Sequence, residues 1–189
     1  LLARQLPNTT VFHNQTRIPV NPLDPENWSE GERVAREQVL RVSKWWFTNV
    51  PGFQDAYLSS ISPVMGLRDS RRIVGKFVLT GEELMKGEHY PDTVASSSYP
   101  IDVHHRDGNR ENTLIRPAAG VFHVPYRCLI TREVENLLVV GRCISADDIA
   151  HAALRVTITC MRTGEAAGRA AKAALDAGIP VNELDGSVL

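Results

Sequence analysis

The residues best suited to bind a charged ligand lie at the start of a long helix that the sequence predicts from about Thr159 to Ala177. Thr157, Thr159 and Cys160 precede Gly164 at this start. The first N–H groups of a helix have no partner within it, and the helix dipole adds a partial positive charge there. This helix start therefore favours an anion. The anion is either a phosphate or the negatively charged edge of a reduced flavin, and the helix start alone does not choose between them.

A second group of candidate ligand-binding side chains is arginine. Arg68, Arg71 and Arg72 lie within a few residues of one another in the segment GLRDSRR. A guanidinium group is a planar fork that suits a carboxylate or a pair of carbonyl oxygens. Arg68 and Arg72 are the predicted catalytic arginines. The alternative is a structural salt-bridge cluster with Asp69 and neighbouring acids.

Histidine supplies the candidate proton carrier. His104 and His105 follow a predicted strand, so their side chains point to opposite faces and only one of them can face a cleft. We predict that His104 donates or accepts a proton in catalysis, because histidine titrates near neutral pH. A metal-dependent hydrolase using His104, His105 and His123 is a further hypothesis, but their spacing matches no recognised ligand pattern, and no metal is expected.

The apolar run Asn136–Gly141 indicates a strand that is buried on both faces and feeds the long helix. Gly141 ends this strand and Arg142 follows it, which is where a ligand meets the carboxyl edge of an open sheet. Gly141, Arg142 and Ser145 are therefore predicted to line the ligand. On the helix, small residues recur at spacings of three and four and make one face nearly flat, so we expect backbone or a large group against Gly164, Ala167, Gly168, Ala171 and Ala174.

The elements that must position these residues are a mixture of helices and strands. Ser29 and Glu32 have capping-box spacing and predict a helix to about Asn49. Thr80 and Glu83 repeat that spacing for a short helix. The remaining expected elements are a short helix over Phe53–Ser60 and strands over Arg17–Val20, Arg72–Thr80, Ser98–His105 and Gly120–Tyr126.

These elements predict three parts along the chain. Residues 1–28 form an irregular linker, residues 29–135 a mixed α+β region on the substrate side, and residues 136–189 a strand and helix of nucleotide-binding α/β architecture. The polar segment DGNREN separates two of the expected strands.

The composition restricts the class of protein. The 189 residues, 43% of them hydrophobic, supply an ordinary core for a soluble globular protein. Lysine and arginine total 21 against 22 acidic residues, so neither nucleic acid nor an anionic membrane is favoured as a partner. No apolar run approaches the roughly 20 residues of a membrane helix, and the first residues do not resemble a signal peptide, so we expect a cytoplasmic protein.

The three cysteines are Cys128, Cys143 and Cys160. Their odd number and the lack of a CxxC pair argue against a disulfide scaffold and a zinc site. Cys143 and Cys160 are interpreted as small buried hydrophobic side chains. A reducing compartment is the simpler assumption.

Five ordered motifs together carry a resemblance to a known family. The chain is similar to FAD-dependent oxidoreductases, and more distantly to the fumarate reductase and succinate dehydrogenase flavoproteins. The resemblance covers roughly Gly52 to Gly178. The motifs are GLRDSRRIVG at 66–75, YPIDVHH at 99–105, FHVPYRCL at 122–129, NLLVVGRCIS at 136–145 and ALRVTITCMRTGEAAG at 153–168.

The resemblance implies FAD as cofactor, and a glutathione reductase-like fold in which the C-terminal strand and helix complete the FAD site. It also implies that Tyr126 and Arg127 flank the flavin ring and that the segment with Arg68 and Arg72 lies near it. Arg155, just before the long helix, is expected to approach flavin or substrate. The implied reaction is hydride transfer with a small organic substrate.

One departure from the family pattern concerns the ADP half of FAD. The GxGxxG fingerprint and its following acidic residue are not present in this sequence. The chain is therefore expected to be the C-terminal part of the fold, with the N-terminal FAD-binding half supplied by the same longer chain or by another subunit. As this fragment alone, it is expected to be inactive. The alternative is a non-catalytic interaction domain derived from such a flavoprotein. The sequence also leaves open whether the chain forms a homo-oligomer.

Overall fold

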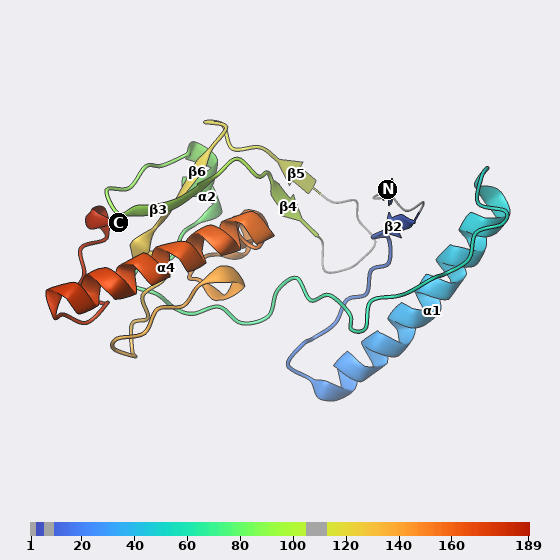
Figure 1. Ribbon diagram of the computed structural model, residues 1–189, viewed down its shortest axis with the longest axis horizontal. Helices are drawn as coiled ribbons and strands as arrows, with labels where there is room; N and C mark the ends of the chain where they lie inside the picture. Colours follow the sequence, from blue (N-terminus) through green and yellow to red (C-terminus); the bar gives the residue numbers. More distant parts are fainter. Residues whose placement is uncertain (1–2, 6–9, 105–112) are drawn as a thin grey trace. The chain divides into compact units, whose positions relative to one another are not determined.

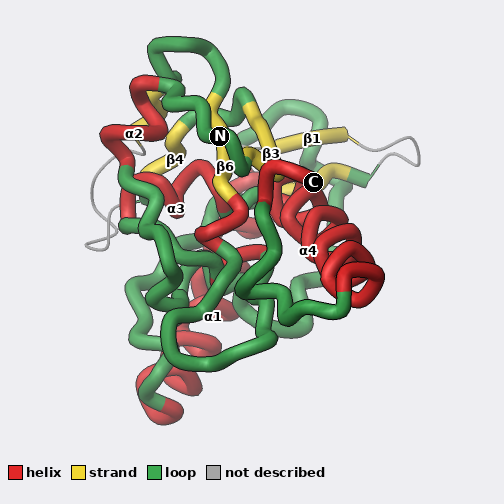
Figure 2. The backbone as a smooth tube through the Cα atoms, turned by 90° about the vertical axis from the view of Figure 1, so that its left-hand side faces the viewer, coloured by secondary structure: helices red, strands yellow, loops and turns green. Residues whose placement is uncertain are grey.

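A computed structural model describes residues 3–5, 10–104 and 113–189 (Figure 1). These residues divide into two compact units, one reaching to Ser70 and the other beginning at Arg71. Both units mix helices with small antiparallel sheets, so the chain has an α+β composition. Figure 2 shows that loops make up much of the chain between the short elements. No helix within the described residues is long and apolar enough to cross a membrane.

Within its described residues, the first unit contains two short strands and one long helix. Strands β1 (Ala3–Gln5) and β2 (Val11–His13) pair antiparallel, and α1 runs over Pro25–Asn49. The predicted capping box at Ser29 and Glu32 is wrong, because α1 begins about one turn earlier. Asp24 caps it by accepting hydrogen bonds from the second and third residues that follow, and proline at the first helical position already has the required φ.

An aromatic cluster holds α1 against the segments on either side of it. The ring of Trp46 lies 4.3 Å from that of His13 and 4.9 Å from that of Phe53, and its indole N–H donates to Gln15. The described chain forms no helix over Phe53–Ser60 and no strand over Arg17–Val20, so both predictions are wrong.

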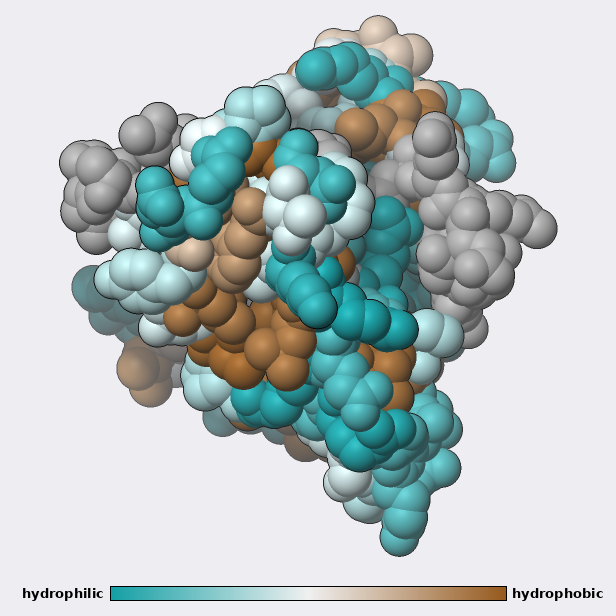
Figure 3. Space-filling model, turned by 90° about the vertical axis from the view of Figure 1, so that its right-hand side faces the viewer, coloured by the Kyte–Doolittle hydropathy of each residue, from teal (hydrophilic) through white to brown (hydrophobic). Residues whose placement is uncertain are grey.

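Several large apolar side chains of this unit remain exposed among the described residues. Figure 3 shows apolar atoms reaching the surface among polar ones. The exposed apolar residues of this unit include Leu40, Trp45, Tyr57, Leu58, Ile61 and Val64.

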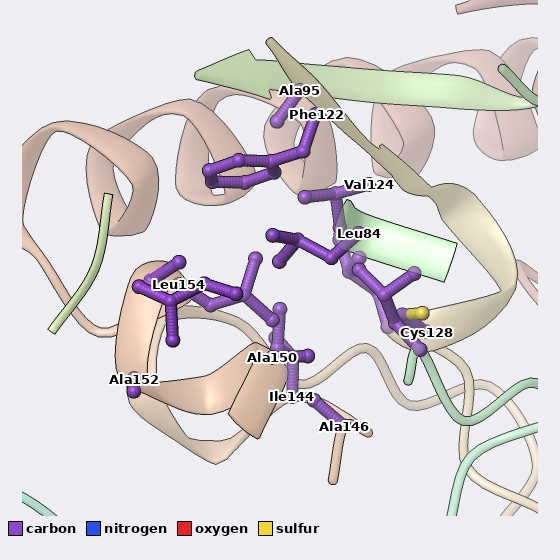
Figure 4. Packing of buried hydrophobic residues seen from close by; sticks show 14 residues of the cluster. Leu84, Ala95, Phe122, Val124, Cys128, Ile144, Ala146, Ala150, Ala152 and Leu154 are labelled. Atoms are coloured by element: carbon purple, nitrogen blue, oxygen red, sulfur yellow. The ribbon is translucent and has the colours of Figure 1, made fainter. Parts of the chain in front are cut away.

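The described residues of the second unit enclose a large hydrophobic cluster and a smaller one around Tyr126, Ile130 and Ala170. Strand β3 (Thr93–Ser97) pairs antiparallel with β6 (Phe122–Pro125), and β4 (Ile101–Val103) pairs antiparallel with β5 (Thr113–Ile115). The predicted strands Ser98–His105 and Gly120–Tyr126 are therefore present in shorter form, whereas β3 and β5 were not predicted. Side chains from these strands meet those of the neighbouring helices, as Figure 4 shows for Leu84, Phe122, Val124, Ile144, Ala150 and Leu154.

Two short helices cover this core. Helix α2 (Gly81–Lys86) begins with the predicted capping box, in which Thr80 and Glu83 bond each other's backbone N–H groups. Helix α3 (Asp148–Leu154) was not predicted, and Asp147 caps it through Ala150 N at 2.7 Å. Three short 3-10 turns complete the unit, η1 (Tyr126–Cys128), η2 (Gly141–Cys143) and η3 (Gly186–Val188).

Helix α4 (Thr157–Ala177) lies alongside β3, which confirms the predicted long helix (Figure 1). Its inner face carries residues spaced three and four apart, and all are buried: Thr159, Thr163, Ala166, Ala170 and Ala174. Its outer face is open, with Met161 68% and Leu175 82% exposed. Apart from the backbone of α4 and the adjacent residues, no described atom lies within 4 Å of the position that a Cβ would take on Gly164 or Gly168.

The segment Arg72–Thr80 does not form the predicted strand. It makes only two isolated bridges to described residues, an antiparallel one between Gly75 and Thr131 and a parallel one between Leu79 and Ala146. Leu79 packs into the core and Phe77 against it, but Val74 and Val78 are exposed and the segment has no continuous partner strand, so the residue types alone misled the prediction.

The segment Asn136–Gly141 is also not a strand, which corrects the expected buried strand. Its one described pairing is an isolated bridge between Leu138 and Ile130. Leu137 is 42% and Val140 36% exposed, so the run is not buried on both faces. The nucleotide-binding strand-then-helix arrangement is therefore not present within the described residues.

The C-terminal tail is tied to the core of the second unit. The Tyr126 hydroxyl donates to the carbonyl of Val181 at 2.8 Å. A Cβ on Gly186 would lie 2.6 Å from that of Tyr126, so only glycine allows this approach. Arg169 donates to the carbonyl of Leu189. The last residues of the chain are thus part of the packed structure.

Candidate functional site

The start of α4 has polar groups that no described residue satisfies. Its N-cap is Val156, and no side chain among the described residues caps the first turn. Thr159 is 1% exposed, and its hydroxyl oxygen has no hydrogen-bond partner within the described chain. A buried hydroxyl left without a partner costs about 1–3 kcal/mol, so a group outside these residues is expected to satisfy it. The described residues therefore leave donors at this helix start without partners, and ligand binding there stays a prediction.

The turn η2 lies against the first turns of α4. Gly141 has a φ of 71°, in the left-handed region that glycine adopts readily. Its N–H donates to the Thr163 hydroxyl at 3.1 Å, and that hydroxyl donates to the carbonyl of Cys160. A Cβ on Gly141 would be 3.9 Å from the Cys160 sulfur. The structure thus brings the predicted residues Gly141, Thr159 and Cys160 to one end of α4, with Gly164 one turn further along its open face.

Arg142 and Ser145 have different surroundings. Arg142 is exposed, and its carbonyl accepts from His151 Nε2 at 3.2 Å, which fixes the turn from the α3 side. Ser145 is fully buried and accepts from Gly75 N at 3.0 Å. Ligand contact by Arg142 stays a prediction, whereas the Ser145 hydroxyl already holds the backbone together.

A buried cluster of three charged or titratable side chains adjoins the start of α4. The Asp102 carboxylate lies 2.9 Å from His104 Nε2 and 3.3 Å from Arg155 Nη2, and Arg155 also donates to the Asp102 carbonyl at 2.8 Å. All three side chains are 11–15% exposed. Arg155 immediately precedes Val156, so it connects the cluster to the helix start. The structure brings together His104 and Arg155, which the sequence singled out separately.

Tyr126 and Arg127 are engaged by the protein itself. Tyr126 is 1% exposed, and burial raises its pKa to about 12, so the phenol stays a donor to Val181. Arg127 donates to both oxygens of Asp92, at 2.9 and 3.2 Å, and its guanidinium lies 4.9 Å from the Phe77 ring centroid. These contacts have structural uses, and flavin contact by either residue stays a prediction.

The predicted catalytic arginines fall in different units. Arg68 belongs to the first unit, where it is partly buried. Arg72 belongs to the second, where it pairs with Asp148 in the first turn of α3. His105 lies outside the described residues. No group of three or more metal-ligating side chains is found within the described residues.

Sequence reasoning missed Asp102, His151 and Thr163. A signal for Asp102 was present, because it precedes His104 by two positions and a strand places such residues on the same face. Thr163 lies one helical turn beyond Thr159 and Cys160, on the predicted helix, so the same spacing rule would have found it. His151 had no such signal, since α3 was not predicted.

Comparison with known proteins gives the class. The FAD dependent oxidoreductase family matches residues 2–189, so the chain belongs to that family. No curated protein and no solved structure gave a match. The cofactor of the family is FAD, and the general activity is that of an FAD-dependent oxidoreductase.

The residues at the start of α4 fit part of this cofactor. The uncapped N–H groups and the Thr159 hydroxyl without a described partner are donors that suit a partly anionic group. They would hold the isoalloxazine edge, where the reduced ring carries negative charge.

Proposed function

We propose that the start of α4 and the turn η2 bind the isoalloxazine of FAD, and that the chain supplies the flavin-facing elements of a hydride-transferring enzyme. The observation that carries this proposal is the buried Thr159 hydroxyl without a partner, beside helix N–H groups that no described side chain caps. A positive helix end stabilises the reduced, anionic flavin and raises its reduction potential. When bound, FAD supplies the hydride chemistry itself.

The substrate side of the proposed site is the cluster around Asp102. His104 carries a proton to or from a small organic substrate, since a histidine next to a carboxylate is held in one tautomer and orientation. Arg155 is fixed by two contacts to Asp102 and adds positive charge next to the helix start. Orientation and charge are the contributions of these residues, and the electron transfer belongs to the flavin.

The proposal assigns the ADP half of FAD to another segment, either of the same longer chain or of a second subunit. The lack of a GxGxxG motif in this sequence supports that assignment. The open outer face of α4, with Gly164 and Gly168 uncovered, offers a surface on which the rest of a glutathione reductase-like fold can pack closely. In this proposal residues 136–189 complete the FAD domain, residues 29–135 form the substrate side, and residues 1–28 are a linker.

The test compares two threonine-to-valine variants, made in the chain expressed together with the sequence encoded upstream of it. Thr159→Val removes the unpartnered hydroxyl. It should weaken flavin binding by about two- to tenfold, the loss of one hydrogen bond, while leaving the stability of the flavin-free protein unchanged or higher. Thr163→Val is the matched control, because it leaves Gly141 N without its acceptor and should destabilise the protein by about 1 kcal/mol.

Visible absorption of the purified protein measures bound flavin. A full-length product without flavin would refute the proposed function and favour a non-catalytic interaction domain. A Thr159→Val variant that binds flavin normally and loses stability would show that the hydroxyl has a structural partner, and would remove the observation on which the proposal rests.

A further inference from the structure

Two sets of side chains that could carry chemistry of their own are the cysteines and a pair of histidines. Cys143 is exposed on η2 and Cys160 is partly buried on α4, so their interpretation as buried hydrophobic side chains is wrong. Exposure alone does not make a binding site. The histidines His89 and His123 offer more, because their side chains are in contact with each other. They belong to different segments of the second unit, so no spacing rule in the sequence predicts the pair.

The rings of His89 and His123 lie edge to face on the second unit. Their centroids are 4.8 Å apart, with an angle of 63° between the ring planes. His89 is exposed and His123 is partly exposed, so small solutes reach the pair. Zinc lies about 2.0–2.1 Å from each imidazole nitrogen that binds it. One ion can therefore bind a nitrogen of each ring after a rotation of the exposed His89 side chain.

Strand β6 and its partner fix the position of His123. Phe122 and Val124 on either side of it are completely buried, so the alternation of a strand directs His123 to the opposite face. Its cross-strand neighbour is Ser96 of β3, whose hydroxyl lies 2.8 Å from His123 Nδ1. Metal-binding histidines usually form a hydrogen bond through the ring nitrogen that does not bind the ion, which fixes the tautomer and the ring orientation. With Nδ1–H donating to Ser96, the lone pair lies on Nε2, and this nitrogen is left for an ion.

The backbone on both sides of His89 is also held in place. Just before it, Glu88 N donates to the carbonyl of Glu83 at 3.2 Å. Just after it, Tyr90 N donates to the Thr93 hydroxyl at 3.2 Å. Only the His89 side chain has to move, so binding an ion orders few additional groups.

We propose that His89 and His123 bind one divalent transition-metal ion of the kind that prefers imidazole, such as zinc, with His123 binding through Nε2 and Ser96 orienting its ring. Imidazole nitrogen suits Zn²⁺, Ni²⁺ and Cu²⁺, whereas Mg²⁺ and Ca²⁺ prefer oxygen ligands. The described residues contribute two side chains, and water completes the coordination of the ion. Such a site holds its ion less firmly than a structural site with four protein ligands, and it leaves positions at which another ligand can bind. The proposal does not rest on flavin binding, because it concerns β6 and the segment after α2 and not the start of α4.

Zinc titration by calorimetry tests the site, in the protein expressed with its upstream sequence and purified without a histidine tag. His89→Phe keeps an aromatic ring against His123 but removes the nitrogens, and His123→Gln keeps a side chain that can bond Ser96. Loss of an outer-shell partner of a metal ligand typically weakens metal binding by roughly 10–100-fold. Loss of either ligand should therefore weaken Zn²⁺ binding by at least about tenfold, and Ser96→Ala should weaken it by about tenfold.

His13→Phe is the matched control, because the described ring contacts of His13 are with Trp46 and Phe53 and not with another histidine. It should leave the Zn²⁺ affinity unchanged, and Mg²⁺ should not compete for the site. Anomalous scattering at the zinc absorption edge, from crystals grown with Zn²⁺, should place the ion about 2.0–2.1 Å from one nitrogen of each ring. Equal Zn²⁺ affinity in the wild-type, His89→Phe and His123→Gln proteins would overturn the proposal. An anomalous peak beside only one of the two rings, or no measurable Zn²⁺ binding, would overturn it as well.

Discussion

Asp102→Asn tests whether the carboxylate, and not merely the shape of the residue, holds the cluster beside α4 together. The amide oxygen of asparagine can accept from His104 or from Arg155, and its NH2 group then faces a donor. Both partners are buried to a similar extent, with side chains 14% and 11% exposed, so water replaces the lost carboxylate poorly. Removing one partner of a buried ion pair costs about 3–5 kcal/mol. We expect about 3 kcal/mol here, since these side chains are not completely buried.

Asp148→Asn is the matched control, because Asp148 also pairs with an arginine predicted to lie in the site. The Asp148 side chain is 62% exposed and well solvated, although Arg72 is only 17% exposed, so the pair is weaker than the Asp102 cluster and the expected loss is about 1 kcal/mol. Equal losses in the two variants would refute the argument that burial sets the strength of these pairs.

The assay must report on the second unit alone. All three tryptophans, Trp28, Trp45 and Trp46, belong to the first unit, so their fluorescence does not follow unfolding around α4. Amide hydrogen exchange of α4 in increasing urea gives the free energy of opening for the second unit. Tryptophan emission then serves as an internal reference, which neither variant should alter.

Three further outcomes follow from other contacts. Tyr126→Phe leaves the Val181 carbonyl without its donor and should lower stability by about 1–2 kcal/mol in urea unfolding, whereas a change in flavin binding with no loss of stability would contradict the structural role of the hydroxyl. The Cys128 thiol should react with iodoacetamide only after unfolding, because it is fully buried and burial raises its pKa to about 12, which mass spectrometry of labelled peptides checks. Burial and the neighbouring His89 lower the pKa of His123 below 6.5, so the unfolded chain binds a proton at this histidine more readily than the folded chain does. Stability should therefore fall on acidification from about pH 7 to 5. A His123→Gln variant whose urea midpoint drops just as steeply over that range would contradict this.

The helices were predictable where local chemistry decides them. The capping box at Thr80 and Glu83 starts α2, and α4 covers the predicted range. The face of α4 that is buried in the described structure is not the predicted face of Gly164 and Gly168, which are exposed. The start of α1 was displaced because Asp24 with a following proline is a stronger cap than Ser29. These signals need no distant partner, which is why the sequence reveals them.

The strands were less predictable because a strand exists only with its partner. The run Asn136–Gly141 has the apolar character of a buried strand, but the described residues offer it only the bridge at Leu138. The same holds for Arg72–Thr80, which bridges two different segments. Hydrophobicity along the chain shows that a segment packs, and it does not show what the segment packs against.

The candidate site likewise contains one part that the sequence predicts and one part that it does not. The helix start at Thr159 and Cys160 was predicted because helix ends always leave N–H groups without partners. The joining of His104 and Arg155 by Asp102 depends on the packing of β4 beside the end of α3, which no local pattern shows. That contact is tertiary information, and it turned two separate candidates into one cluster.

The segment 180–189 limits how far the second unit can be shortened. The carbonyl of Leu189 accepts from Arg169, close behind the glycine at 186 that fits against Tyr126. Deleting these ten residues would remove Val181 and uncover the phenol in the core. Trimming this segment is therefore a poor route to a smaller crystallisable protein.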